Sequence, residues 1–200
     1  MPKTKAKTKT KTIEERYKKK SQLEHILDRP DSYIGSIEMT NMDEPMWICD
    51  DNGQFIKKSL KIVPGLYKIF DEILVNAGDQ WVRLKQMIEE EGESNLKPVK
   101  NIKIEIDRKL NQISVYNDGE GIDIALHQEH NMYVPQLLFG ELLTSENYDD
   151  DENTQRLTGG KNGYGAKLTN IFSKKFYIET CDIRVNKKFK QTYYDNMSRK

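Results

Sequence analysis

The sequence predicts an α+β fold in which helices cover one face of a mostly antiparallel sheet. Apolar side chains recur at three- and four-residue steps through residues 64–91, which is typical of one face of an α-helix. Residues 102–106 and 113–115 instead alternate apolar and polar side chains, which is typical of two strands joined by a turn. The sequence contains no internal repeat, so its 200 residues suit one layered domain.

The segment before the long helix predicts a short helix and then a hairpin. A stripe of Leu23, Ile26 and Leu27 marks the short helix, and Pro30 should end it, because the residue before a proline disfavours helical geometry. Further on, the turn residues at 51–53 (Asp-Asn-Gly) divide "MWICDDNGQFIKKSLKIV" into the two halves of a hairpin.

The second half of the chain predicts two helices and two strands. "YVPQLLFGELL" is apolar enough for a packed helix, whereas "TSENYDDDENTQRL" is polar and predicts a loop. "TGGKNGYGAKLTNIF", residues 158–172, places glycines before the apolar start of another helix. "KFYIET" and "KKFKQTYY" then have the composition of strands.

The composition excludes several classes of function. The 32 basic residues balance 32 acidic ones, so net charge indicates no acidic or basic partner. The two cysteines and three histidines have neither zinc-site spacing nor the number that a disulfide scaffold needs. No run approaches the ~18 apolar residues of a membrane span, so we expect an intracellular protein without a membrane partner.

Glu72 and Asn76 lie four residues apart in the predicted long helix, so their side chains project from one face, one turn apart. A carboxylate here can take a proton from water, and a carboxamide oxygen can bind a hard cation. On this feature alone, a solvated polar face is the simpler interpretation.

The segment "NDGEGI", residues 117–122, follows directly after a predicted strand. Its two glycines permit a sharp turn and a close approach of the backbone to a ligand. Asn117 stands at the strand end, where its side chain can offer a donor and an acceptor to a planar base. An ordinary turn at the end of a strand is the alternative interpretation.

The glycine-rich loop is similar to a phosphate-binding loop but matches neither familiar pattern. Ala166 displaces the lysine by one position from the Walker pattern, and Leu168 stands where the dinucleotide pattern needs its third glycine. Converging backbone N–H groups and the N-terminal dipole of the next helix would still favour phosphate. The loop residues suited to this are Gly159, Gly160, Gly163, Gly165, Lys161 and Lys167. A glycine-rich hinge is the alternative.

In sequence order these features read E-x-x-x-N on a helix, N-D-G-x-G after a strand, and G-x-x-G-x-G opening a helix. This order resembles the GHKL ATPases, whose nucleotide site is called the Bergerat fold. Longer blocks, among them "VPGLYKIFDEILVNA" and "TGGKNGYGAKLTNIFS", are similar to the N-terminal ATPase domain of eukaryotic-type DNA topoisomerase II, over about residues 13–198. The resemblance implies a GHKL two-layer α+β sandwich that is truncated at its C-terminal end.

The resemblance implies roles for individual residues. Glu72 would be the catalytic base that activates water, and Asn76 would bind ATP and coordinate Mg²⁺ between the phosphates. Asn117 would contact adenine or ribose, and Tyr17 would reach across a dimer to the other subunit's nucleotide. The remaining implied ATP contacts are Ser145, Glu146, Asn147, Gly160, Lys161, Asn162, Gly163, Tyr164, Gly165, Ala166 and Lys167, with residues 144–160 as a lid.

The resemblance also implies an organisation of the chain. Residues 1–12 would be a disordered basic tail, 13–35 an N-terminal strap, and 36–200 an incomplete ATP-binding domain. ATP and Mg²⁺ would be the cofactors. Double-stranded DNA and a second copy of the chain, in a homodimer, would be the partners, in the nucleus or another site of DNA replication.

In that family, a later transducer domain supplies a lysine to the γ-phosphate, and still later domains cut DNA. We therefore expect a fragment of a longer protein or a truncated product, which alone binds Mg²⁺-ATP weakly and hydrolyses it slowly or not at all. Asp123 stands where the family usually has proline, which should loosen that turn, and residues 82–97 should extend the long helix or form a surface excursion. The alternatives are a nucleotide-binding module without turnover and another GHKL member, such as a chaperone or mismatch-repair ATPase.

Overall fold

The structure, a computed structural model, describes residues 12–13, 19–89, 92, 95–142 and 164–200. In chain order the elements are α2 (Gln22–Asp28), the short 3-10 helix η1 (Pro30–Ser32), β1 (Thr40–Asn41), β2 (Met46–Cys49), β3 (Phe55–Lys58), β4 (Lys61–Ile62), α3 (Pro64–Glu89), β5 (Ile102–Asp107), β6 (Gln112–Asn117), β7 (Leu126–His127), β8 (Met132–Tyr133), α4 (Val134–Gly140), α5 (Gly165–Ile171), β9 (Lys175–Asp182) and β10 (Lys187–Tyr194). Within the described ranges, no helix combines the length and the apolar character that crossing a membrane requires.

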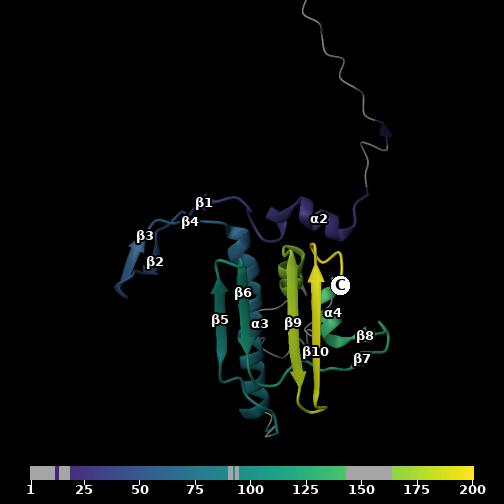
Figure 1. Cartoon of the computed structure of the whole chain (residues 1–200). Helices are drawn as coiled ribbons and strands as arrows, with labels where there is room; N and C mark the ends of the chain where they lie inside the picture. The colour runs from purple at the N-terminus through teal and green to yellow at the C-terminus, as the bar shows by residue number, and fades with distance from the viewer. Residues whose placement is uncertain (1–11, 14–18, 90–91, 93–94, 143–163) are drawn as a thin grey trace, which may run out of the picture.

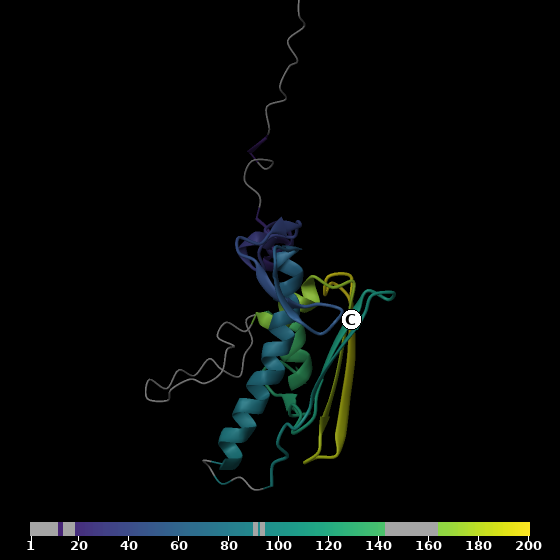
Figure 2. The same ribbon diagram turned by 90° about the vertical axis from the view of Figure 1, so that its left-hand side faces the viewer.

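The long strands form one layer of the molecule, and α3, α4 and α5 form the other. Figure 1 shows β5, β6, β9 and β10 next to one another, and the quarter turn in Figure 2 places α3 and α4 on one side of these strands. The strand pairs that the described residues form are all antiparallel. The predicted α+β sandwich is confirmed.

The sheet of the described residues consists of separate two-stranded ladders rather than one continuous sheet. β5 pairs with β6, and β9 pairs with β10. The loop after β6 connects these two ladders, because the Ile122 N–H donates to Thr180 Oγ1 at 3.0 Å and the Ile124 N–H donates to Asp182 Oδ2 at 3.1 Å.

The predicted long helix is confirmed as α3, and residues after 82 extend it as far as Glu89. Ala77 and Leu84, on the predicted apolar stripe, are buried. Leu66 and Trp81 were predicted on the same stripe but are 55% and 46% exposed. The reason is that α3 packs mainly on α5 and β6, which cover only part of its length.

The alternating pattern of β5 predicted a strand correctly, but its apolar face is open. Ile102, Ile104 and Ile106 share one face of the ladder and are 39%, 47% and 61% exposed. β5 pairs only with β6 among the described residues, so its side chains have neighbours along one edge only.

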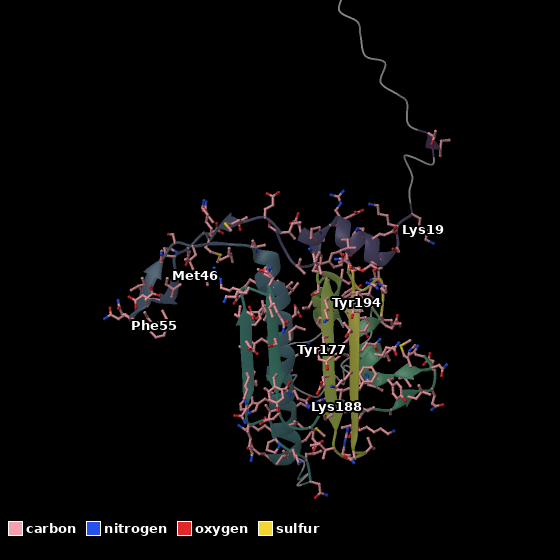
Figure 3. The ribbon with its side chains drawn as sticks, viewed as in Figure 1. Lys19, Met46, Phe55, Tyr177, Lys188 and Tyr194 are labelled. Atoms are coloured by element: carbon pink, nitrogen blue, oxygen red, sulfur yellow. The ribbon has the colours of Figure 1, made fainter. Side chains whose placement is uncertain are left out.

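The predicted hairpin is confirmed as β2 and β3, with its turn fixed by Asp50. The Asp50 carboxylate accepts hydrogen bonds from the N–H groups of Asn52 (2.9 Å) and Gln54 (2.8 Å). Residues 61–62 do not continue this hairpin but form β4, which pairs with β1. Figure 3 shows Met46 and Phe55 in the hairpin, which extends away from the rest of the molecule.

The N-terminal segment contributes directly to the core. Ile26 of α2 and Ile34 after η1 form a buried cluster with Leu168 and Ile171 of α5. α2 begins with a capping box at Ser21, which was not predicted. It ends at Asp28, shortly before Pro30, as predicted. The N-terminal segment is therefore packed on α5, while the predicted boundary between strap and domain stays a prediction.

Ile26→Ala should lower the free energy of unfolding by about 2–5 kcal/mol, the usual cost of truncating a fully buried isoleucine. Ile26 is 0% exposed. Urea unfolding followed by circular dichroism measures the change. The matched control is Ile106→Ala in β5, which should change the value by less than about 0.5 kcal/mol, as most exposed substitutions do. Equal effects of the two substitutions would contradict the packing of α2 on α5.

Candidate active site

Glu72 and Asn76 lie on successive turns of α3, as predicted. The Glu72 side chain is 23% exposed, and its Oε1 lies 2.5 Å from the Nζ of Lys68, one turn earlier. The Glu72 hydrogen bond favours the charged ammonium and raises the pKa of Lys68 above its ordinary value. Asn76 is exposed, so its carboxamide oxygen is accessible to a ligand.

The first residue of α5 lies against the other side of the Glu72 carboxylate. Gly165 is so close to Glu72 Oε2 that a Cβ at this position would overlap it. The Thr169 hydroxyl fixes α5 on α3 by donating a 2.7 Å hydrogen bond to the Ile69 carbonyl oxygen. The structure therefore brings two predicted site segments together, and a Cβ at position 165 would force the Glu72 carboxylate to move.

Three more predicted ATP contacts stand at the start of α5. The Tyr164 hydroxyl accepts a hydrogen bond from Gln22 Nε2, and its ring lies 6.2 Å from the ring of Tyr33. Ala166 is buried, and Lys167 is only 4% exposed. Burial lowers the pKa of Lys167 to about 8. A negatively charged ligand beside Lys167 would be favoured, because it would offset the cost of burying an ammonium group.

Asn117 ends β6, and its neighbour Asp118 fixes the turn that follows. The Asp118 carboxylate accepts hydrogen bonds from Asn101 Nδ2 (2.7 Å), the Asn101 N–H (2.9 Å) and the Lys100 N–H (2.7 Å). These bonds, that of the Asn101 side chain foremost, lower the pKa of Asp118 to about 2. Asp118 is therefore structural. Asn117, whose Nδ2 donates to the Asp118 carbonyl oxygen at 3.0 Å, is the residue left to contact a ligand.

The other predicted contacts lie outside the described residues. They are Tyr17, Ser145, Glu146, Asn147, Gly160, Lys161, Asn162 and Gly163, together with the predicted lid and most of the predicted tail. The described part of the chain thus contains the α3 side of the candidate site, the end of β6 and the start of α5.

Two features around α3 were not predicted from the sequence. The first is the Lys68–Glu72 ion pair, whose four-residue spacing was a visible signal. The second is a cavity of about 180 Å³ beside the second half of α3. Its lining residues are Gln80, Arg83, Leu84, Met87, Leu96, Glu120, Gly121, Ile122, Asp123 and Arg184.

The turn at Asp123 differs from the expectation of a loosened turn. The Asp123 carboxylate forms an ion pair with Arg184, and the Arg184 Nε also bonds Asp182 Oδ1 at 3.1 Å. This pair attaches the turn to the β9–β10 connection. No local pattern predicted it, because the two partners are far apart in the sequence.

Known proteins resemble nearly the whole chain. DNA topoisomerase 2 of Plasmodium falciparum is 55% identical over 192 residues, which are 96% of this chain and 13% of that protein. Human DNA topoisomerase 2-alpha is 50% identical over 188 residues, which are 94% of this chain and 11% of that protein. No family model matches the chain.

Solved structures also match most of the chain. The ATPase region of Saccharomyces cerevisiae topoisomerase II matches with a TM-score of 0.81 and 49% identity, over 92% of this chain and 44% of that one. The 43K ATPase domain of Thermus thermophilus gyrase B has a TM-score of 0.53 and 18% identity, over 87% of this chain and 32% of that one, and shows the fold alone.

The chain spans only 13% and 12% of the length of the first two curated relatives, so it matches one part of a much longer protein. Two solved structures that match it at 48–49% identity are the ATPase region of the Saccharomyces cerevisiae enzyme and the ATPase and transducer domains of Balamuthia mandrillaris DNA topoisomerase II. The chain therefore belongs to the DNA topoisomerase II family and corresponds to part of that family's ATPase region.

Proposed function

We propose that this chain binds Mg²⁺-ATP and contributes Glu72 as the catalytic base of ATP hydrolysis within a longer type II DNA topoisomerase. The observation that supports the proposal is the approach of Gly165 to the Glu72 carboxylate. This approach joins two motifs of the predicted site, in a chain 49% identical to a topoisomerase II ATPase region.

The ionised Glu72 carboxylate would accept a proton from water while the water oxygen attacks the terminal phosphorus of ATP. The bond from that phosphorus to the bridging oxygen breaks, and ADP leaves with the bonding electrons. A carboxylate that is 23% exposed, with neighbours on two sides, suits this task because its orientation is restricted.

Asn76 would hold Mg²⁺ through its carboxamide oxygen. In the described ranges, no three His, Cys, Asp or Glu side chains are grouped so that they could hold a metal ion. A single protein oxygen ligand suits Mg²⁺, which keeps several waters and takes further ligands from substrate phosphates. When bound, the ion would supply positive charge that neutralises the phosphate oxygens.

Lys167 would favour the triphosphate by its charge, and Asn117 would contact the adenine or ribose. Double-stranded DNA would be the substrate of the complete enzyme, which would pass one duplex through a transient break in another. A second copy of the chain would complete the site, with Tyr17 reaching the partner's nucleotide. The nucleus, or another site of DNA replication, is the proposed location. The relatives' name, DNA topoisomerase 2, supports the choice of DNA.

A second candidate function is nucleotide binding without turnover. The exposed Asn76 and the buried Lys167 would serve this function equally well. The two functions differ in whether the bound ATP is hydrolysed, with Glu72 as the base.

Glu72→Ala in the full-length protein should lower ATP hydrolysis by at least about 100-fold, because a positioned base contributes 10²–10⁴-fold. Nucleotide binding should stay within about threefold, since binding does not depend on proton transfer. Phosphate release and titration with a fluorescent ATP analogue measure the two effects. Glu89→Ala, at the exposed end of the same helix, is the control and should change neither. Binding of the ATP analogue by the parent protein without any phosphate release would favour binding without turnover, whereas unchanged hydrolysis in Glu72→Ala would show that Glu72 is not the base.

Gly165→Ala should lower hydrolysis at least about tenfold, because the added methyl group must displace the Glu72 carboxylate, and small misplacements are costly in catalysis. Gly78→Ala on α3 is the matched control, because a Cβ there meets nothing within 4 Å. It should keep full activity and raise helix stability by up to about 1 kcal/mol. Phosphate release and urea unfolding measure both variants. If both variants were equally active, Glu72 and Gly165 would not be neighbours.

Lys167→Met should weaken ATP binding at least about tenfold, the effect of losing about 1.4 kcal/mol. It should also raise the free energy of unfolding at pH 7 by on the order of 1–3 kcal/mol, by removing a buried ammonium. The folded-state pKa of about 8 lies below the ordinary 10.5. Between these values the unfolded chain binds more protons, so stability rises with pH.

This rise should be present in the parent between pH 8 and pH 9.5 and absent in Lys167→Met. Urea unfolding at both pH values and titration with a fluorescent ATP analogue measure the effects. Lys175→Met, at an exposed position of β9, is the control and should behave like the parent. A Lys167→Met variant that is less stable than the parent at pH 7 would show that the ammonium group stabilises the folded protein.

A further inference from the structure

The ion pair between Lys68 and Glu72 has no task in the function proposed above. We propose that Lys68 is a positioning residue, which holds the Glu72 carboxylate in the orientation needed to accept a proton from water. The proposal rests on the proposed function, in which Glu72 is the base.

The two oxygens of the Glu72 carboxylate have different neighbours. Oε1 lies 2.5 Å from Lys68 Nζ, and Oε2 faces Gly165 at the start of α5. A carboxylate in contact on both sides cannot rotate about its terminal bond without breaking the bond to Lys68 or moving α5. Lys68 therefore decides which oxygen lies on the α5 side.

A second lysine–glutamate pair on α3 shows what an ordinary surface pair looks like. Lys85 and Glu89 also stand four residues apart, but their N–O distance is 3.9 Å and their side chains are 52% and 62% exposed. Pairs of that kind contribute little, because water competes with them and ordering both side chains costs entropy. At Lys68 and Glu72 the contact is 2.5 Å, and the carboxylate is only 23% exposed.

Two further observations agree with a strong contact. The hydrogen bond to Glu72 is the largest cause of the raised pKa of Lys68. The only other carboxylate recorded near Lys68 in the described residues is that of Asp71, at 3.8 Å. Charge-assisted hydrogen bonds of short length are about twice as strong as neutral ones. Lys68 thus pairs with Glu72 rather than with Asp71.

For the reaction, the two oxygens of the Glu72 carboxylate would have different roles. With Oε1 held by the ammonium, Oε2 is the oxygen left to receive a proton from a water near α5. Removing the ammonium would leave the base present but free to rotate. The chemical step would slow, while nucleotide affinity would change little.

The test compares Lys68→Met, Lys68→Arg and the matched control Lys85→Met in the full-length protein. Steady-state ATP hydrolysis should show kcat lowered at least about tenfold in Lys68→Met, with KM within about twofold, as expected when alignment alone is lost. Lys68→Arg, which keeps a donor and the charge, should recover kcat to within about threefold. Lys85→Met should match the parent.

A double variant tests whether Lys68 acts through Glu72. If it does, adding Lys68→Met to Glu72→Gln should cause no further loss of kcat, because the two side chains are then coupled. An additional tenfold loss in the double variant would overturn the proposal. So would a normal kcat in Lys68→Met, or a raised KM with kcat unchanged.

A failure of the proposed function would be recognised by different results. If the parent protein binds no ATP, or if Glu72→Gln hydrolyses ATP normally, then Glu72 is not the base. If the parent hydrolyses ATP and Glu72→Gln does not, while Lys68→Met is as active as the parent, only the role of Lys68 is overturned. Circular dichroism of each variant checks folding, and Lys68→Gln provides a second neutral substitution should Lys68→Met not fold.

Discussion

The contact between α3 and α5 is the interaction on which the candidate site depends. α5 has seven residues, and its buried side, with Leu168 and Ile171, is in the core together with Ile26 and Ile34. The hydrogen bond from Thr169 to the Ile69 carbonyl then sets the distance to α3. Gly165 lies against the Glu72 carboxylate as a consequence of this packing, and a Cβ at this position would displace the carboxylate from the place it has here. The geometry of the carboxylate is thus determined by the hydrophobic core rather than by local polar contacts alone.

The charged residues near the site divide into those that stabilise the fold and those that cost stability. Both carboxylate oxygens of Asp118 accept hydrogen bonds from Lys100 or Asn101, and these bonds stabilise its charged form. Lys167 is the opposite case, because burial disfavours its charge and lowers its pKa to about 8. Residues whose pKa values are shifted by burial are more frequent at functional sites than elsewhere. The shifted pKa of Lys167 therefore favours this residue as a contact for a charged ligand.

The sequence predicted the helices and strands well because their periodicity is a local property. The stripe of α3, the alternation of β5 and β6 and the turn before Gln54 all have their causes within a few residues. Burial was predicted less well, since Leu66, Trp81 and the isoleucines of β5 depend on what packs against them. The site shows the same limit. Glu72 and Asn76 could be found from their spacing. The structural role of Asp118 could not, because its partner Asn101 lies 17 residues earlier and meets it only when β5 pairs with β6. The close approach of Gly165 to Glu72 likewise depends on the tertiary packing of α5.

The N-terminal segment and the candidate base are attached to the same short helix. Gln22 of α2 bonds the Tyr164 hydroxyl, and the Tyr33 ring lies 6.2 Å from that of Tyr164, directly before Gly165. α5 is only about two turns long, and Tyr164 is its N-cap residue, directly before Gly165. A displacement of Tyr164 would therefore move Gly165 with it. The carboxylate of Glu72 would then lose its neighbour on the Oε2 side while keeping Lys68 on the other. The packing of residues 22–34 is for this reason part of the geometry of the candidate site, although none of these residues contacts Glu72 in the recorded interactions of the described chain.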